Sequence, residues 1–303
     1  MRSGSRAVRR LTRLLAALAA PCLAAGVFLA GCDQPSGSTS GTAGKTLRIG
    51  VIPKGTTHVF WKSIEAGARK GGKEVGAEIQ WQGPLKEDDR EGQRKVIETF
   101  ITGNVNGIVL APLDEDALVE PVNMAMRAGK PVVIIDSGLK GDNFVSYVAT
   151  PNKKGGELGA ERLLEILGGK GRVLLLRYQI GSASTDQREA GFIETMKKSP
   201  GIELVPPALD QYGGATAGSA QTIAEALLSR YPELDGIFCP NESSTTGMLQ
   251  ALRNSNRAGK VKFVGFDASD ALVEAMKSGQ LQGLVLQNPV MMGVGRMSAA
   301  SFS

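Results

Sequence analysis

Two aspartates stand where the hydroxyl groups of a small ligand could be bound. Asp136 and Asp267 each close a short apolar run, PVVIID and KFVGFD respectively. An ionised carboxylate accepts two hydroxyl donors at once, and charge-assisted hydrogen bonds contribute roughly 1.5–3 kcal/mol each. In open α/β sheets, ligands bind at the carboxyl ends of the strands. Two such edges facing each other would make a cleft with a carboxylate on each wall.

Three more polar side chains could complete the lining of this cleft. Arg188 lies at the start of a predicted helix in the segment SASTDQREAGF, where its forked donors could reach ring or hydroxyl oxygens. Asn241 follows a predicted strand and a proline, and Gln287 ends the last predicted strand. Any one of them alone is more often a cap or a turn residue. Together, at successive strand ends, they indicate a polar ligand site.

Aromatic residues follow the first predicted strand. Phe60 and Trp61 lie between that strand and the next helix, and only fifteen residues of the chain are aromatic. An aromatic ring offers a flat apolar surface to the C–H face of a sugar ring, although either ring could pack into a core instead. His58 is the sole histidine. It could bond a ligand hydroxyl or remain a solvated loop residue, but it has no partners for catalysis or metal binding.

The motifs of the main cofactor-dependent enzymes are missing from the sequence. No GxGxxG follows the first predicted strand, no P-loop occurs, and no nucleophile–base pair surrounds the single histidine. Cys22 and Cys32 belong to the N-terminal segment that is interpreted below as an export signal and a lipid attachment site. Cys239 is then the single remaining cysteine, so the chain has neither an internal disulfide nor a zinc site of paired cysteines. We therefore expect a binding protein without cofactor or metal, and not an enzyme.

Short apolar strands must position these residues, and they alternate with amphipathic segments such as 90–101 and 217–231. The predicted strands cover residues 47–52, 78–82, 107–111, 131–136, 145–149, 172–176, 202–205, 236–239, 262–266 and 283–287. This alternation indicates parallel sheets covered by helices on both faces. Ten strands are too many for one sheet in a chain of this length, so we predict an α/β fold with two Rossmann-like lobes.

An internal repeat supports the division into two lobes. GIVLAP at residues 107–112 is followed by RAGK at 127–130 and a strand ending at Asp136. GIFCPN at residues 236–241 is followed by RAGK at 257–260 and a strand ending at Asp267. Two α/β segments could match by chance, but the paired aspartates favour a repeat.

The N-terminus has the pattern of an export signal. Five arginines and no acidic residue precede an apolar stretch at residues 14–31, which could also remain as a membrane anchor. The segment LAGC at residues 29–32 resembles the lipobox of bacterial lipoproteins, so we predict cleavage of residues 1–31 and acylation of Cys32. Residues 32–45 are small and polar, typical of a flexible tether. We expect lipid anchoring on the periplasmic side of the inner membrane or on the outer cell surface.

The formal charge of +5 arises entirely from this segment. Five of the 35 basic residues lie in it, which leaves 30 basic against 30 acidic residues. A neutral chain has no general attraction for nucleic acid. We expect a monomer that binds no nucleic acid.

From Leu47 to about Met297, the sequence resembles the periplasmic sugar-binding proteins of the ribose/galactose type, which share their fold with lac-repressor-type regulators. The similar segments are VFWKSIEAGA, GKPVVIID, TPNKKGGELGA, STDQREAGF, CPNESSTTGMLQAL, VGFDAS and VLQNP. The resemblance implies a type I periplasmic binding protein fold, in which a hinge joins the two lobes. We expect residues 46–149 plus 288–303 in the N-terminal lobe and 150–287 in the C-terminal lobe. Family members continue beyond the position of Met297 with a further strand or crossover segment.

The resemblance also implies which residues line the cleft. Carried over by position, they are Phe60, Trp61, Asp136, Asn152, Arg188, Asn241, Asp267 and Gln287. His58 stands where ribose-type members have Asn, Pro151 replaces an acidic residue and Glu242 replaces Asp. Ser137 replaces the Arg of ribose-type members, which argues against ribose and leaves another pentose, a hexose, an inositol or a modified sugar.

The resemblance implies a receptor that closes on a sugar or sugar-like polyol and docks on the membrane permease of an ABC importer. A sensory protein that presents the same closed form to a chemoreceptor or sensor kinase is the alternative. A DNA-binding regulator is disfavoured, because a signal and lipobox stand where a helix-turn-helix would be.

Overall fold

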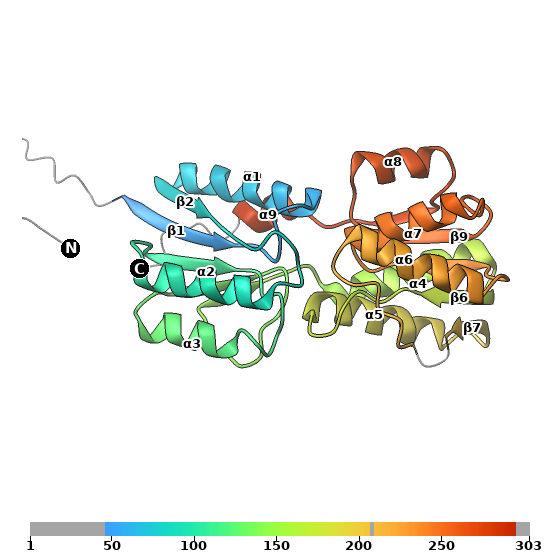
Figure 1. The fold of residues 1–303 in the computed structure, drawn as a ribbon, viewed down its shortest axis with the longest axis horizontal. Helices are drawn as coiled ribbons and strands as arrows, with labels where there is room; N and C mark the ends of the chain where they lie inside the picture. Colours follow the sequence, from blue (N-terminus) through green and yellow to red (C-terminus); the bar gives the residue numbers. More distant parts are fainter. Residues whose placement is uncertain (1–45, 207–208, 295–303) are drawn as a thin grey trace, which may run out of the picture. The chain divides into compact units, whose positions relative to one another are not determined.

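The computed structural model describes residues 46–206 and 209–294. Two five-stranded parallel sheets, in the orders β2-β1-β3-β4-β5 and β10-β9-β8-β6-β7, form the cores of two lobes (Figure 1). The predicted α/β fold with two Rossmann-like lobes is confirmed. The predicted signal segment, Cys32, the tether to residue 45 and the predicted lobe residues 295–303 lie outside the described residues.

The elements follow one another in simple βα alternation. The first lobe contains β1 (Leu47–Ile52), α1 (Val59–Glu74), β2 (Ala77–Trp81), α2 (Arg90–Thr102), β3 (Gly107–Leu110), α3 (Val119–Arg127), β4 (Val132–Ile135) and β5 (Ser146–Val148). The second lobe contains α4 (Asn152–Leu167), β6 (Lys170–Leu175), α5 (Ala183–Met196), β7 (Gly201–Val205), α6 (Ala217–Arg230), β8 (Gly236–Phe238), α7 (Glu242–Asn254), β9 (Lys262–Phe266), α8 (Asp270–Lys277) and β10 (Gly283–Val285). The chain then returns to the first lobe with α9 (Pro289–Val294).

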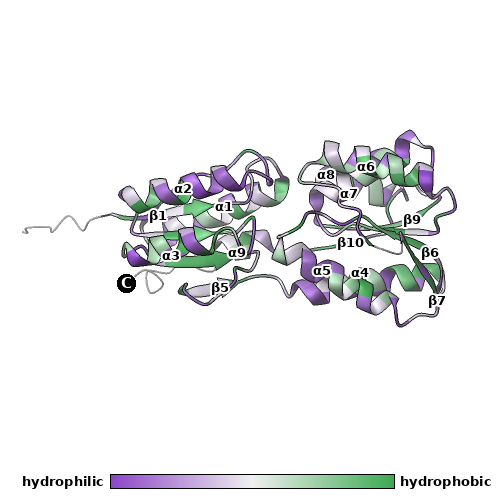
Figure 2. Ribbon diagram, turned by 60° about the horizontal axis from the view of Figure 1, so that its bottom comes forward, coloured by the Kyte–Doolittle hydropathy of each residue, from purple (hydrophilic) through white to green (hydrophobic). Residues whose placement is uncertain are grey.

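Each sheet is buried between two layers of helices, as the apolar strands predict. In the first lobe, α1 and α9 cover one face and α2 and α3 cover the other. In the second, α4 and α5 cover one face and α6, α7 and α8 the other. Figure 2 shows the hydrophobic strands between helices that turn hydrophilic residues outward. Successive strand residues point to opposite faces, so Val173 and Leu174 join different core clusters.

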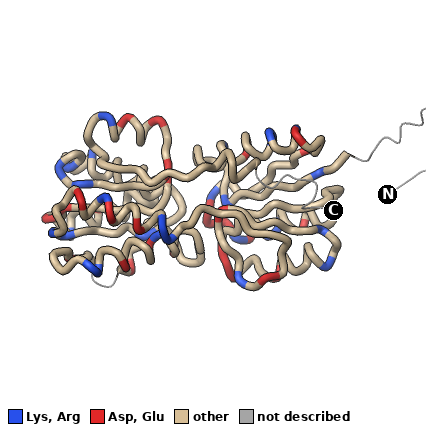
Figure 3. Tube along the Cα trace, turned by 180° about the vertical axis from the view of Figure 1, so that it is seen from behind, with Lys and Arg blue, Asp and Glu red and all other residues tan. Residues whose placement is uncertain are grey.

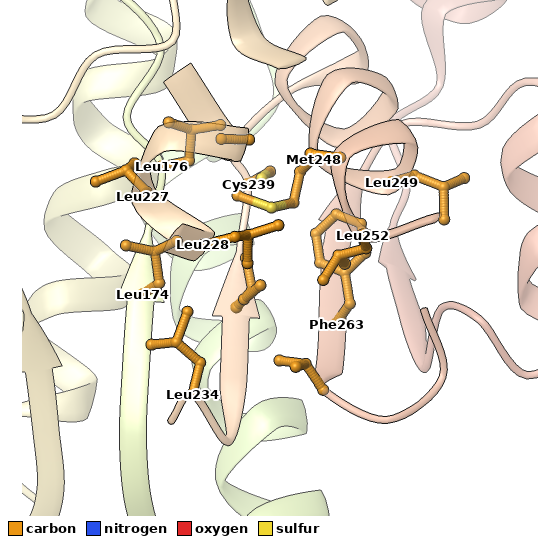
Figure 4. Close-up of a cluster of buried hydrophobic side chains, with 14 of the residues drawn as sticks. Leu174, Leu176, Leu227, Leu228, Leu234, Cys239, Met248, Leu249, Leu252 and Phe263 are labelled. Carbon is orange, nitrogen blue, oxygen red and sulfur yellow. The ribbon is translucent and has the colours of Figure 1, made fainter. Parts of the chain in front are cut away.

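The larger core cluster lies between β6, β8, β9 and the helices α6 and α7. Figure 4 shows Cys239 and Met248 within it, close to Phe263. Cys239 is a buried free thiol, and burial raises its pKa well above the ordinary value. It is therefore a packing residue rather than a reactive one.

The predicted repeat is visible in the topology. The two sheets have the same order when β6 to β10 are matched with β1 to β5. Asp136 and Asp267 occupy equivalent places and both have left-handed backbones, with φ of 62° and 67°. The N–H of Asp136 donates to the carbonyl of Val148 and that of Asp267 to Val285, at 2.9 and 2.8 Å. Asp is one of the few residues that tolerate this conformation.

Two connections join the lobes within the described residues. One runs from β5 to α4 and the other from β10 to α9. The Thr150 hydroxyl on the first donates to the Gln287 amide oxygen on the second, at 2.7 Å. The prediction that Gln287 ends the last strand is wrong, because β10 ends at Val285. We propose the lobe boundaries in these connections, at 149/150 and 287/288.

Candidate ligand-binding site

A pocket lies between the carboxyl ends of the two sheets. Charged residues gather where the two lobes meet (Figure 3). The lining residues are Lys54, His58, Phe60, Trp61, Glu87, Asp136, Tyr178, Ser184, Thr185, Arg188, Asn241, Glu242, Asp267 and Gln287. The structure therefore brings together all of the predicted ligand-binding residues except Asn152.

Arg188 lines the pocket and is held there by hydrogen bonds to neighbouring groups. It lies in the second turn of α5 rather than at the helix start, and only 2% of it is exposed. Its Nε donates to Asn152 Oδ1 at 2.8 Å and its Nη1 to the Pro240 carbonyl at 3.0 Å. The guanidinium lies 4.0 Å from the centre of the Phe266 ring. Asn152, buried behind the pocket, thus orients Arg188.

The remaining nitrogen of Arg188 is free to bind a ligand. Nη2 is the one buried side-chain nitrogen or oxygen without a hydrogen-bond partner in the described part of the chain. Leaving a buried donor unpaired costs about 1–3 kcal/mol, and more for a charged group. Burial lowers the pKa of Arg188, although Asp267 and Asp136 oppose that effect. A ligand oxygen beside Nη2 would remove this cost.

The two strand-end carboxylates face this guanidinium from both lobes. Asp136 is buried, with Oδ2 at 3.5 Å from Lys54 Nζ. Asp267 is also buried, and its Oδ1 accepts a hydrogen bond from Gln287 Nε2 at 2.8 Å. Burial raises the pKa of Asp267 to about 6, despite the opposing charge of Arg188. Burial also favours the neutral form of Lys54 and so lowers its pKa, although the charges of Asp136 and Glu87 oppose this effect.

Glu87 connects residues of both lobes. It accepts hydrogen bonds from Trp61 Nε1 at 2.6 Å and from the Tyr178 hydroxyl at 2.5 Å. Its Oε1 lies 2.5 Å from His58 Nδ1. Burial lowers the pKa of His58, but the hydrogen bond and charge of Glu87 outweigh burial, so the pKa is raised overall. Burial raises the pKa of Glu87, yet His58, Tyr178 and Lys54 lower it overall. His58 is therefore paired and is not a solvated loop residue.

Phe60 and Trp61 belong to the core of the first lobe and also line the pocket. They lie in the first turn of α1, with 8% and 2% exposed, and pack with Ile64 in the core cluster. Their rings meet edge to face, with centroids 4.9 Å apart and an interplanar angle of 79°. The core and pocket interpretations of these aromatics are thus compatible, because one edge of the cluster reaches the pocket.

The side-chain amide of Asn241 is already hydrogen-bonded within the protein. It is the N-cap of α7, where Oδ1 accepts from the N–H and the hydroxyl of Ser244 at 3.2 and 2.6 Å. Its Nδ2 donates to Ser243 Oγ at 3.1 Å. A contact with a ligand would have to share these groups, so a ligand role for Asn241 stays a prediction.

Several lining residues were missed by the sequence reasoning. Lys54 and Tyr178 follow β1 and β6 closely, so the rule that ligands bind at strand ends could have found them. Glu242 directly follows the predicted Asn241. Glu87 comes from the loop before α2, where the sequence gives no periodic signal. Ser184 and Thr185 open α5 and resemble ordinary residues of a helix start.

The arrangement favours binding over bond breaking. Within the described ranges, no group of three or more His, Cys, Asp or Glu side chains could hold a metal ion, and no helix is long and apolar enough to cross a membrane. The charged side chains are held by hydrogen bonds and ion pairs with their neighbours. The groups that can still bond a ligand are the Nη2 donor of Arg188 and the remaining carboxylate lone pairs of Asp136 and Asp267. Such a set matches the hydrogen-bonding pattern of hydroxyl groups.

Comparisons with known proteins agree with this geometry. A profile described as the periplasmic binding protein domain matches residues 49–301. The D-allose-binding periplasmic protein of Escherichia coli (strain K12) is 30% identical over 251 residues, which cover 80% of each chain. The D-ribose/D-allose-binding protein of Pseudomonas aeruginosa is 29% identical over 269 residues, which cover 86% of this chain and 83% of that protein.

Solved structures extend the similarity to three dimensions. The periplasmic component of an ABC-type sugar transport system from Hahella chejuensis has a TM-score of 0.80 and 33% identity, and covers 84% of this chain and 93% of its own. A carbohydrate transporter solute-binding protein from Agrobacterium radiobacter, in complex with D-arabinose, has a TM-score of 0.80 and 32% identity, with 84% and 88% covered. Since the profile spans both lobes and these relatives align over most of their length, this chain belongs to the periplasmic binding protein domain family, whose members bind ligands rather than transform them.

Proposed function

We propose that this chain is an exported, lipid-anchored receptor that captures a neutral sugar or sugar-like polyol between its lobes and delivers it to an ABC-type importer. The observation that carries the proposal is the buried, unpartnered Nη2 of Arg188 in a pocket that Asp136 and Asp267 also line. A hydroxyl group can accept from a guanidinium and donate to a carboxylate at the same time. A molecule with several neighbouring hydroxyl groups therefore suits all three side chains.

The charges of the pocket favour a neutral ligand. Asp136 and Asp267 are balanced by Lys54 and Arg188. Glu87 is paired with His58, and its other bonds are to protein donors. The fourth acidic residue, Glu242, accepts from two N–H groups at the positive end of α1. A charged solute would leave one of these groups unbalanced in a buried site, which is costly. The relatives named above bind D-allose, D-ribose and D-arabinose, and these neutral sugars support the proposal.

The cellular part of the proposal rests on the N-terminal sequence and on the relatives. The segment LAGC at residues 29–32 provides an acylation site, and the following polar tether would let the lobes move near the membrane. Several acyl chains, at about 0.8 kcal/mol per buried methylene, would hold the protein stably at the membrane surface. The similar component of an ABC-type sugar transport system supports delivery to an importer.

Thermal unfolding and calorimetry with a ligand panel test the binding function. The chain from Lys45 onward, which forms one compact unit, is screened against D-allose, D-ribose, D-arabinose, D-fucose, xylitol, myo-inositol, glycine and alanine. A binding sugar at 100 times its dissociation constant should stabilise the protein by about 2.7 kcal/mol.

Matched variants show whether the binding occurs in the pocket. Asp136→Asn should remove the stabilisation, because it weakens a charge-assisted bond to the ligand while the amide tolerates the left-handed backbone. Asp142→Asn replaces an exposed aspartate downstream of β4 and should leave it unchanged. Stabilisation by amino acids but by none of the sugars and polyols would contradict the proposed ligand class.

A further inference from the structure

Helix α1 begins at the pocket without a capping group of its own. Its N-cap residue, His58, makes no side-chain capping bond, and its first turn contains no acidic residue. The first N–H groups of a helix have no partner within the helix and carry the positive end of its dipole. Here the Glu242 carboxylate accepts two of them. Oε1 accepts from the Val59 N–H at 3.1 Å and Oε2 from the Phe60 N–H at 2.9 Å.

The Glu242 carboxylate belongs to the opposite lobe. Glu242 is the first residue of α7, which packs on the second sheet, whereas α1 packs on the first. Only 8% of Glu242 is exposed. The paired bond therefore forms only when the lobes are together. When they separate, the carboxylate and the helix end would both face water.

We propose that Glu242 is a positioning residue that sets the closed fraction of the protein, and thereby its affinity, without binding the ligand itself. Each carboxylate oxygen is already directed at an N–H of α1. The closure part of this inference concerns the protein alone, whereas the affinity part rests on the proposed function.

Other hydrogen bonds also join the two lobes directly. The Tyr178 hydroxyl donates to Glu87 at 2.5 Å, and the Ser184 N–H donates to Ser137 Oγ at 3.1 Å. Lys54 Nζ donates to Ser184 Oγ at 3.1 Å. These bonds and the Glu242 contact are made between protein groups alone, so they stabilise the closed form independently of any contact with the ligand. Glu242 is the best place to intervene, because its contact partner is backbone and not another pocket side chain.

A contact of this kind has a distinctive effect on binding. The apparent dissociation constant is the intrinsic constant divided by the fraction of protein in the binding-competent state. A change in the closed fraction therefore alters the affinity for every ligand by the same factor. A residue that touches the ligand would instead change the ratio between ligands.

Glu242→Gln weakens the contact with little change in size. The amide keeps one oxygen but turns an N–H₂ group toward a backbone N–H, so one of the two bonds is lost. Asp270→Asn is the matched control. Asp270 is likewise the first residue of a helix in the second lobe, α8, but its side chain is exposed and does not line the pocket.

Distances between the lobes report closure directly. Spin labels are attached through Lys70→Cys on α1 and Gln250→Cys on α7, both exposed positions. The chain from Lys45 onward contains one native cysteine, Cys239, which is buried and should not be labelled. Distance distributions are measured without ligand, and calorimetry is done with two sugars that bind in the panel above.

We expect a closed population in the unaltered protein without ligand. Glu242→Gln should lower its closed-to-open ratio about tenfold, which corresponds to about 1.4 kcal/mol. Both dissociation constants should rise by one common factor, equal to the closed fraction of the unaltered protein divided by that of the variant. Asp270→Asn should change neither. A ligand-free protein without a closed population, an unchanged distribution in Glu242→Gln, or different factors for the two sugars would each overturn the inference. If no sugar binds, the proposed function fails, and the distances alone decide whether Glu242 controls closure.

Discussion

Replacing Asp267 by Asn should stabilise the ligand-free protein while weakening ligand binding. Asp267 is buried at the end of β9, and burial raises its pKa from 3.8 to about 6. Asn has the same size, tolerates the φ of 67°, and can still accept the hydrogen bond from Gln287. The substitution therefore removes a buried charge with little other change.

The sign and size of the effect follow from the two pKa values. Because the folded pKa lies above the unfolded one, the stability linked to Asp267 is present at low pH and is lost as the pH rises through about 6. At pH 7 this loss amounts to about 3 kcal/mol, and at pH 4.5 to about 1 kcal/mol. Asp267→Asn should recover these amounts. The loss of a charge-assisted bond should weaken ligand binding roughly 10- to 100-fold.

Urea unfolding without ligand at pH 7 and pH 4.5 measures the stability, and calorimetry at pH 7 measures the affinity. Asp270→Asn, which changes an exposed aspartate three positions further on, serves as the control and should alter neither. A variant that is less stable than the unaltered protein at pH 7 would refute the reasoning. So would a gain of the same size at both pH values, because it could not come from the ionisation of Asp267.

Two further substitutions probe the site and the fold. Arg188→Lys should weaken binding at least about tenfold in calorimetry, because a single ammonium cannot keep both existing bonds and still reach the ligand; unchanged affinity would show that Nη2 is not the ligand donor. Gly67→Ala should destabilise the protein by roughly 1–3 kcal/mol in urea unfolding, because the new methyl group would lie 2.2 Å from the Val290 carbonyl oxygen. Gly218→Ala, at a helical glycine with open space around it, should not destabilise, and an equal loss in both variants would argue against the packing explanation.

The fold was predictable because local patterns and tertiary structure agree. Strands such as β3 and β4 are short, β-branched and buried on both faces, so their apolar runs had one reasonable interpretation. The end of β10 was predicted wrongly, at residue 287 and not at Val285. Leu286 and Gln287 continue the apolar-polar pattern, yet they leave the sheet because the chain must cross back to the first lobe. A crossing of this kind depends on tertiary structure that the local sequence does not encode.

The site was predictable where chemistry and strand ends coincide, as at Asp136, Asp267 and Arg188. The site was less predictable where a polar side chain supports a neighbouring residue or a helix end instead of the ligand. Asn152 supports Arg188 from behind, and Asn241 caps α7, so the ligand roles drawn from the sequence compete with structural ones. Glu87 was missed because its partners come from two segments that lie far apart in the chain, around residues 58–61 and 178–179. Only the assembled fold shows that they converge.

The packing of α9 on α1 has a consequence for how the protein folds. The two helices approach closely enough that a side chain on Gly67 or Gly293 would meet the backbone of the other helix, yet they stand near opposite ends of the described chain. The second lobe is one uninterrupted stretch and can form its core as soon as β10 has been synthesised. The first lobe must wait for α9 to arrive. During folding its half-covered sheet is therefore the last surface to be buried, and the one most exposed to aggregation or proteolysis.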